Sequence, residues 1–207
     1  MGSGQHDGHL GAVYGAKAPE QVAALYDGWA DTYDAEMARA GYRHPSVGLA
    51  LLARYAPRGT GPVLDAGCGT GLLGDWLGIL GFAPVHGLDL SAGMLAKARA
   101  KGAYAALHHL ALGGALPFAD GQFAAVISTG VFTTGHVGAE ALPELLRITA
   151  PGGPVVLTVK TTLWDGGFRL ALQGMAGLTI VEVTDPYVSM PGESGTVPSL
   201  AVVARRS

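Results

Sequence analysis

The stretch Val63–Leu72 reads VLDAGCGTGL: a short apolar run, an acidic residue, and then glycines at three alternate positions. The run before Asp65 predicts a buried strand. Gly67, Gly69 and Gly71 follow where the chain must turn, and residues without a Cβ let a ligand approach the backbone. Taken alone, the glycines are equally consistent with a tight turn that binds nothing. They depart from the dinucleotide pattern G-x-G-x-x-G, because position 72 is leucine.

Strands and helices alternate along the chain after this turn. The apolar runs that predict strands are 62–67, 84–91, 105–112, 123–132, 154–160, 178–185 and 199–206. Helical patterns separate most of them, at 71–80, 91–102, 140–150 and 167–177. We therefore predict a Rossmann-like α/β fold, with a seven-stranded, mainly parallel sheet and helices on both faces. No helix separates the last two strands, so that pair is predicted to be antiparallel.

The chain before the first strand has a different character. Residues 19–58 contain three helical patterns, which predict an N-terminal helical cap. Residues 1–18 are rich in Gly and His without periodicity and are expected to form a loose arm. We expect the cap and the α/β part, residues 59–207, to form one domain.

Composition limits the function classes. The 207 residues are 49% hydrophobic and carry a net charge of −3, which argues against a broad nucleic-acid groove. Cys68 is the one cysteine, so no internal disulfide is possible and a reducing compartment is expected. No apolar run is long enough to span a bilayer, and the N-terminus does not resemble a signal peptide. We expect a cytoplasmic protein that binds neither membranes nor nucleic acids.

A second acidic residue follows the second predicted strand. Asp89 lies eighteen residues after Gly71, in GLDLS. A carboxylate at that strand end can accept hydrogen bonds from both hydroxyls of a ribose. The glycine loop, Asp89 and the helix after it together indicate a nucleoside-containing cofactor.

Four longer segments resemble the class I S-adenosylmethionine-dependent methyltransferases: VLDAGCGTG, GLDLSAGMLAKARAKG, LPFADGQFAAVIS and LRITAPGGPVVLTVK. The resemblance covers about residues 20–207 in order and spacing. Two further segments, VAALYDGWADTYDAEM and GVFTTGHVGAEAL, are similar to the small Williams–Beuren syndrome region methyltransferase-like group. The resemblance implies methyl transfer from S-adenosylmethionine and no bound metal.

The resemblance also implies which residues hold the cofactor. The methionyl part would lie along the loop made of Asp65, Ala66, Gly67, Cys68, Gly69 and Gly71. Asp89 would bind the ribose, and the adenine would lie between Leu90 and Met94, beside Ala111 and Leu112. Ser128, Thr129 and Gly130 would border the sulfonium.

Two alanines depart from the family pattern, which often has Asp at both positions: Ala111 and Ala124. Loss of the first carboxylate would remove one charge-assisted hydrogen bond to the adenine, about 1.5–3 kcal/mol of cofactor affinity.

His136, in TTGHVG, is the best candidate for a general base. It follows the fourth predicted strand, and its ordinary pKa lies near working pH. The alternative is a loop histidine that caps the next helix or binds water.

The predicted cap carries three aromatic residues on one helical face, at Tyr26, Trp29 and Tyr33. We expect Trp29 to pack the helix onto the sheet domain. We expect Tyr26 and Tyr33 to cover the cofactor, with the Tyr33 hydroxyl reaching the methionyl carboxylate. The bend at Tyr42–His44 either lines the acceptor pocket or forms a surface turn.

The leading hypothesis is methyl transfer to an O, N or S nucleophile of a small molecule. Nucleic-acid bases are disfavoured, because the fourth strand ends in STGVF instead of [DN]-P-P-[YFW] and the cysteine lies in the glycine loop. One alternative is a nicotinamide-dependent oxidoreductase, which the missing third glycine opposes. Another is a non-catalytic cofactor-binding or partner-binding protein, which the two alanines favour. The oligomeric state is not predicted.

Overall fold

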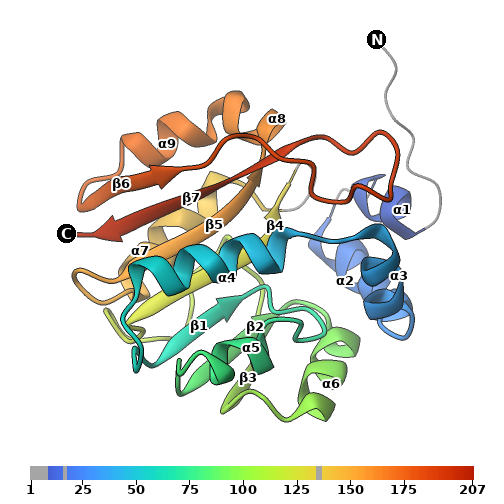
Figure 1. The fold of residues 1–207 in the computed structure, drawn as a ribbon, viewed down its shortest axis with the longest axis horizontal. Helices are drawn as coiled ribbons and strands as arrows, with labels where there is room; N and C mark the ends of the chain where they lie inside the picture. The colour runs from blue at the N-terminus through green and yellow to red at the C-terminus, as the bar shows by residue number, and fades with distance from the viewer. Residues whose placement is uncertain (1–8, 16–17, 134–136) are drawn as a thin grey trace.

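The computed structural model describes residues 9–15, 18–133 and 137–207. Its centre is a seven-stranded sheet in the order β3-β2-β1-β4-β5-β7-β6 (Figure 1). The strands are β1 (Val63–Ala66), β2 (Val85–Asp89), β3 (Ala106–His109), β4 (Ala125–Phe132), β5 (Pro154–Lys160), β6 (Leu178–Val183) and β7 (Ser199–Arg206). Neighbouring strands from β3 to β5 are parallel, and β7 runs antiparallel to both β5 and β6. The predicted fold class is confirmed.

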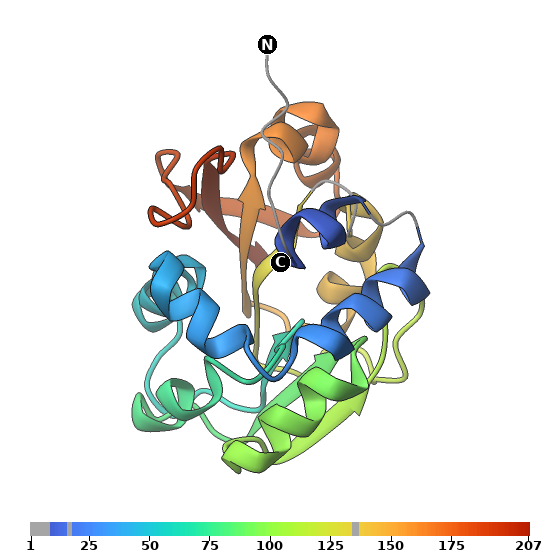
Figure 2. The ribbon, with the colours of Figure 1, turned by 90° about the vertical axis from the view of Figure 1, so that its right-hand side faces the viewer.

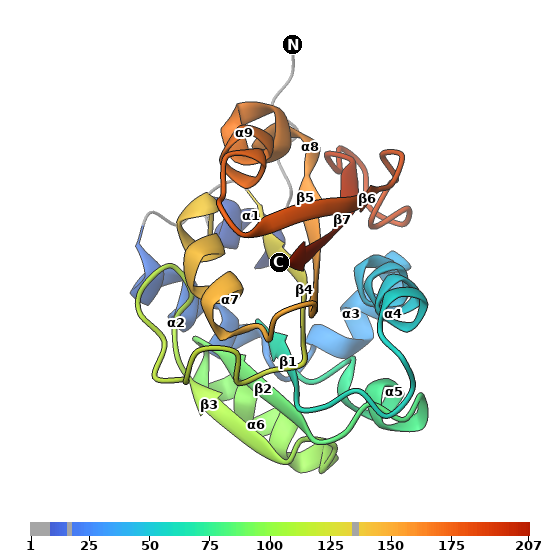
Figure 3. The same ribbon diagram turned by 90° about the vertical axis from the view of Figure 1, so that its left-hand side faces the viewer.

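Helices cover both faces of the sheet (Figure 3). On one side lie α4 (His44–Tyr55), α5 (Gly74–Ile79) and α6 (Ala92–Lys101); on the other lie α7 (Leu142–Ile148) and α9 (Arg169–Gln173). Short turns complete the chain: η1 (Ala139–Ala141), α8 (Thr161–Leu163) and η2 (Trp164–Phe168). Ala125 and Ile127 pack in the α4–α5 core, whereas Val126 packs under α7. This alternation is the period of a strand buried on both faces.

Three helices form a cap beyond the carboxyl ends of the parallel strands: α1 (His9–Gly15), α2 (Pro19–Trp29) and α3 (Tyr33–Ala40) (Figures 1 and 2). A buried cluster that includes Val13, Trp29, Met37 and Met190 holds them together. Trp29 therefore packs within the cap and against Met190, which lies in the segment between β6 and β7 of the α/β part.

The expectation of a loose arm up to residue 18 is wrong for residues 9–15, which form α1. Val13 is fully buried in the cap cluster, and the His9 ring stacks on Trp29 with centroids 5.4 Å apart. These tertiary contacts stabilise a helix whose local sequence shows no helical period.

Side-chain hydrogen bonds join the cap to the α/β part. The Asp27 carboxylate accepts from the Ser91 hydroxyl and from the Gly93 amide at 2.8 Å, so α2 is tied to the start of α6. Asp34 of α3 accepts from the Thr70 hydroxyl of the glycine loop. These hydrogen bonds hold the cap over the edge of the sheet where β1 and β2 end. In the part of the chain that the structure describes, no helix has both the length and the apolar character to cross a bilayer.

Candidate functional site

The glycine loop leaves β1 at the point where the sheet topology changes direction. β1 pairs with β2 on one side and with β4 on the other, so a crevice opens beyond its carboxyl end. Gly67 has φ +83°, and a Cβ there would lie 2.2 Å from Cγ2 of Val131. Both the conformation and the space therefore require glycine. Gly71 instead packs against Ala98 and Tyr104, on the side of the loop that faces α6.

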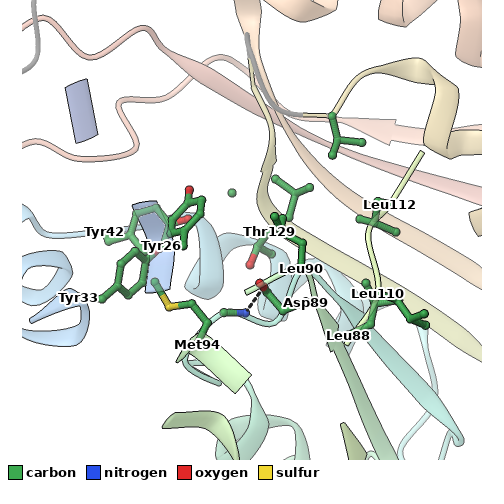
Figure 4. Close-up of a pocket in the computed structure, with 15 residues that line it drawn as sticks. Tyr26, Tyr33, Tyr42, Leu88, Asp89, Leu90, Met94, Leu110, Leu112 and Thr129 are labelled. Carbon is green, nitrogen blue, oxygen red and sulfur yellow. Dashed lines mark hydrogen bonds between the residues drawn. The ribbon is translucent and has the colours of Figure 1, made fainter. Parts of the chain in front are cut away.

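The Asp89 carboxylate lies at the tip of β2, buried and held by two backbone amides. One oxygen accepts from Gly69 at 2.8 Å, drawn as a dashed line in Figure 4, and the other from Ser91 at 2.9 Å. Burial raises the pKa of this carboxyl, and the amide hydrogen bonds oppose the shift. A carboxylate has about four acceptor positions, so it still has capacity for the two hydroxyls of a ribose.

Asp65 lies at the end of β1 and is also buried. One of its oxygens accepts from the Tyr104 hydroxyl at 2.7 Å. The other, Oδ1, is buried and has no hydrogen-bond partner among the described residues. Burial raises the pKa of Asp65 to about 7. A buried acceptor without a donor is unfavourable, so this oxygen fits a cationic donor such as the ammonium of a methionyl group.

One pocket collects most of the predicted cofactor residues. It is lined by the predicted Tyr26, Tyr33, Gly67, Gly69, Asp89, Leu90, Met94, Leu112, Thr129 and Gly130. Figure 4 shows the three tyrosines and Met94 on one side, Asp89, Leu90 and Thr129 in the middle, and Leu88, Leu110 and Leu112 on the other side. An apolar end, a central carboxylate and a polar end fit the adenine, ribose and methionyl parts of S-adenosylmethionine.

Other predicted residues do not line this pocket. Asp65 and Cys68 line a smaller adjoining cavity with Gly67 and Gly69. Ala66 is buried within β1, and the buried Ser128 donates its hydroxyl to the Ala66 carbonyl at 2.6 Å. Ser128 therefore supports the loop and does not line the pocket.

Ala111 also lies outside the pocket lining, because β3 ends at His109 and the chain continues irregularly. Leu110 and Leu112, on either side of it, line the pocket instead. The predicted base, His136, lies outside the described residues.

Five further residues line the pocket without having been predicted to bind the cofactor: Tyr42, Leu88, Leu110, Val131 and Val137. Leu110 could have been predicted, because it lies two residues before Leu112, which was expected to contact the adenine. Tyr42 had no such local signal. A Cβ on Gly130 would lie 1.8 Å from the Tyr42 hydroxyl oxygen, so the bend after α3 packs directly over the tip of β4.

A second cavity adjoins the cofactor pocket beneath the cap and shares Tyr26, Tyr33, Tyr42 and Gly130 with it. Its other lining residues are Trp29, Met37, His44, Phe132, Thr133, Lys160 and Met190. Tyr42 and His44 therefore line a cavity, and that this cavity receives the acceptor stays a prediction.

His44 is buried in the second cavity's wall, with both ring nitrogens in polar contacts. Nδ1 lies 2.7 Å from the Tyr187 hydroxyl, and Nε2 lies 3.4 Å from Oγ of Ser199. Burial, with a smaller contribution from the charge of Lys160, lowers the pKa of His44 to about 3. The imidazole is therefore neutral at working pH.

Residues 64–157 match the family model described as "Methyltransferase domain". The human methyltransferase-like protein 27 is 38% identical over 168 residues, which cover 78% of this chain and 67% of the relative. The malonyl-[acyl-carrier protein] O-methyltransferase of Pseudescherichia vulneris is 37% identical over 138 residues, which cover 66% of this chain. The chain spans about half, 52%, of the length of that second relative.

Among solved structures, a TehB-like SAM-dependent methyltransferase from Corynebacterium glutamicum superposes with a TM-score of 0.66 at 23% identity. The match covers 89% of this chain and 99% of that one. This likeness shows the fold.

Proposed function

The chain belongs to the class I S-adenosylmethionine-dependent methyltransferases, and from this premise we propose that it methylates an O, N or S nucleophile of a small molecule. The predicted family and cofactor are confirmed, and the family favours this reading over a nicotinamide-dependent oxidoreductase. The acceptor class, the site residues and the cytoplasmic location stay predictions.

The residues of the first pocket fit the cofactor in three parts. Asp89 would bind the ribose, Leu90 and Met94 would contact the adenine, and Asp65 with the glycine loop would hold the methionyl group. When bound, the cofactor supplies a methyl group already activated on a sulfonium. The protein's own task is therefore to orient an acceptor and exclude water, with no covalent attachment to a side chain.

The observation that carries the small-molecule proposal is the junction of the two cavities under the cap. They share Tyr26, Tyr33, Tyr42 and Gly130, so an acceptor in the second cavity would lie next to the methionyl end of the first. Hydrogen bonds accepted by Asp27 and Asp34 hold the cap helices over this edge. A covered, largely aromatic cavity favours a small acceptor over a folded macromolecule.

Proton removal is needed only where the attacking atom starts protonated. His44 is poorly suited to accept that proton, because its pKa is lowered to about 3 and both nitrogens already have polar partners. The role of His136 as a general base stays a prediction.

A binding experiment tests the cofactor site. We expect calorimetry to detect S-adenosylmethionine and S-adenosylhomocysteine binding, and no binding of NAD. Asp89→Asn should weaken binding at least about tenfold, because the new amide NH₂ faces a backbone N–H that now donates to the carboxylate. Asp31→Asn, which alters an exposed partner of Lys97, is the matched control and should leave affinity unchanged. Equal affinity in Asp89→Asn and the wild type would contradict the assignment.

Turnover tests the acceptor class. We expect S-adenosylhomocysteine release with members of a panel of small phenols, amines, carboxylic acids and thiols, and none with DNA or RNA. Cofactor binding without turnover on any acceptor would favour the non-catalytic alternative.

A further inference from the structure

Lys160 is a buried cation in the wall of the second cavity. It ends β5 and is 6% exposed. Among the residues that the structure describes, no carboxylate lies within ion-pair distance of its ammonium. Lysines this deeply buried are ordinarily paired with a negative charge, so the missing counter-ion needs an explanation.

Two neutral groups hold the Lys160 side chain in place. Its Nζ donates to the Val197 carbonyl at 2.8 Å and to Oγ of Ser189 at 3.2 Å. An ammonium has three N–H donors, so these contacts leave one donor and the full positive charge uncompensated. Burial lowers the pKa of Lys160 to about 8, which still leaves the protonated form in the majority at neutral pH.

The other described lining residues of the cavity are uncharged, and they include both apolar side chains and the hydroxyl-bearing Tyr26, Tyr33, Tyr42 and Thr133. The His44 imidazole is neutral, and the charge of Lys160 contributes to the lowering of its pKa. Trp29, Phe132 and Met190 supply the apolar walls, and all three are buried. The cavity therefore combines one cation with apolar walls and neutral hydroxyls.

We propose that the methyl acceptor is a small carboxylic acid with an apolar body, and that Lys160 is the counter-ion of its carboxylate. A carboxylate would take the remaining N–H in a charge-assisted hydrogen bond and neutralise the buried ammonium. The apolar body would pack against Trp29 and Phe132, next to the junction with the cofactor pocket. This inference rests on the proposed function and names the substrate class of the same site.

The test uses the full chain saturated with S-adenosylhomocysteine and matched pairs of acid and neutral amide. The pairs are phenylacetate with phenylacetamide, indole-3-acetate with indole-3-acetamide, and hexanoate with hexanamide. We expect calorimetry to show at least one acid binding about tenfold or more tightly than its amide. If no acid binds more tightly than its amide, the proposal is overturned. This comparison uses the wild-type protein, so it decides the proposal even where a variant does not fold.

Substitutions then assign the preference to one side chain. Lys160→Met should abolish the acid preference, Lys160→Arg should retain most of it, and both should still bind S-adenosylhomocysteine. Lys97→Met, which removes an exposed cation on α6, is the control and should keep the full preference. An acid preference that persists in Lys160→Met overturns the role of Lys160. Failure of the wild type to bind S-adenosylhomocysteine, read in the same titrations, overturns the proposed function itself.

Discussion

Asp65 combines nearly complete burial with one oxygen that no described residue hydrogen-bonds. The residue follows directly from the sequence pattern, because it ends the strand before the glycine loop. Its electrostatic state does not, since that depends on Tyr104, which approaches from beyond α6 and donates to the other oxygen. With desolvation as the main cause, the pKa of Asp65 rises to about 7, so the ionised form is disfavoured in the cofactor-free protein.

A pH-dependent stability follows from Asp65. Its folded-state pKa is raised above the unfolded value of 3.8, so its contribution to stability is full below pH 3.8 and is lost as pH rises through about 7. Asp65→Asn can still accept from Tyr104 but does not titrate. Urea unfolding should therefore show the variant gaining stability relative to the wild type between pH 5 and pH 8, by at least about 1 kcal/mol. A difference that is independent of pH would contradict the raised pKa.

At the scale of elements, the turn from β1 to α5 depends on glycine for two separate reasons. Gly67 has φ +83°, and Val131 leaves no space for a Cβ there. Gly59, in the loop between α4 and β1, has a similar φ of +88° but nothing within 4 Å of a Cβ. Substitution at Gly59 therefore reports backbone strain alone, whereas substitution at Gly67 reports backbone strain together with a clash at the site.

Gly67→Ala and Gly59→Ala form a matched pair. Gly59→Ala should lose about 1–2 kcal/mol of stability, because an alanine is strained at positive φ. Gly67→Ala should lose more, because its Cβ would also clash with Val131. Only Gly67→Ala should also lose most of its affinity for S-adenosylhomocysteine, because the new methyl group displaces Val131 and the loop that line the pocket. Denaturant unfolding and calorimetry measure the two effects. Full cofactor affinity in Gly67→Ala would show that the loop does not approach the ligand.

At the scale of the whole molecule, the cap and the sheet together enclose the second cavity. Residues from four separate elements line this cavity: Trp29 of α2, His44 of α4, Phe132 of β4 and Lys160 of β5. Asp27 is one of the residues whose hydrogen bonds hold the cap. The hydrogen bond from Ser91, and to a lesser extent the one from Gly93, lowers the pKa of Asp27. A cavity built from such distant segments depends on how firmly the cap is held.

Asp27→Ala should loosen the cap while leaving the sheet intact, because it removes both hydrogen bonds between α2 and α6. We expect faster amide hydrogen exchange in residues 19–40, unchanged exchange in β1, β4 and β5, and severalfold weaker cofactor binding. Asp31→Ala, which removes an exposed ion pair with Lys97, is the control and should change little. Unaltered exchange in the cap would show that its apolar cluster alone holds it.

The sheet, the glycine loop and Asp89 were predictable because their signals are local. Strand periodicity spans a few residues, and parallel strands bring their carboxyl ends to one edge, so the residues that follow β1 and β2 must meet there. No local sequence pattern predicts α1, the placement of Tyr42 over Gly130, or the cavity around Lys160. His44 meets Tyr187 across 143 positions of sequence. Such contacts arise only when separate segments pack against one another, since burial and hydrogen-bond partners are properties of the folded chain and not of any short stretch of it.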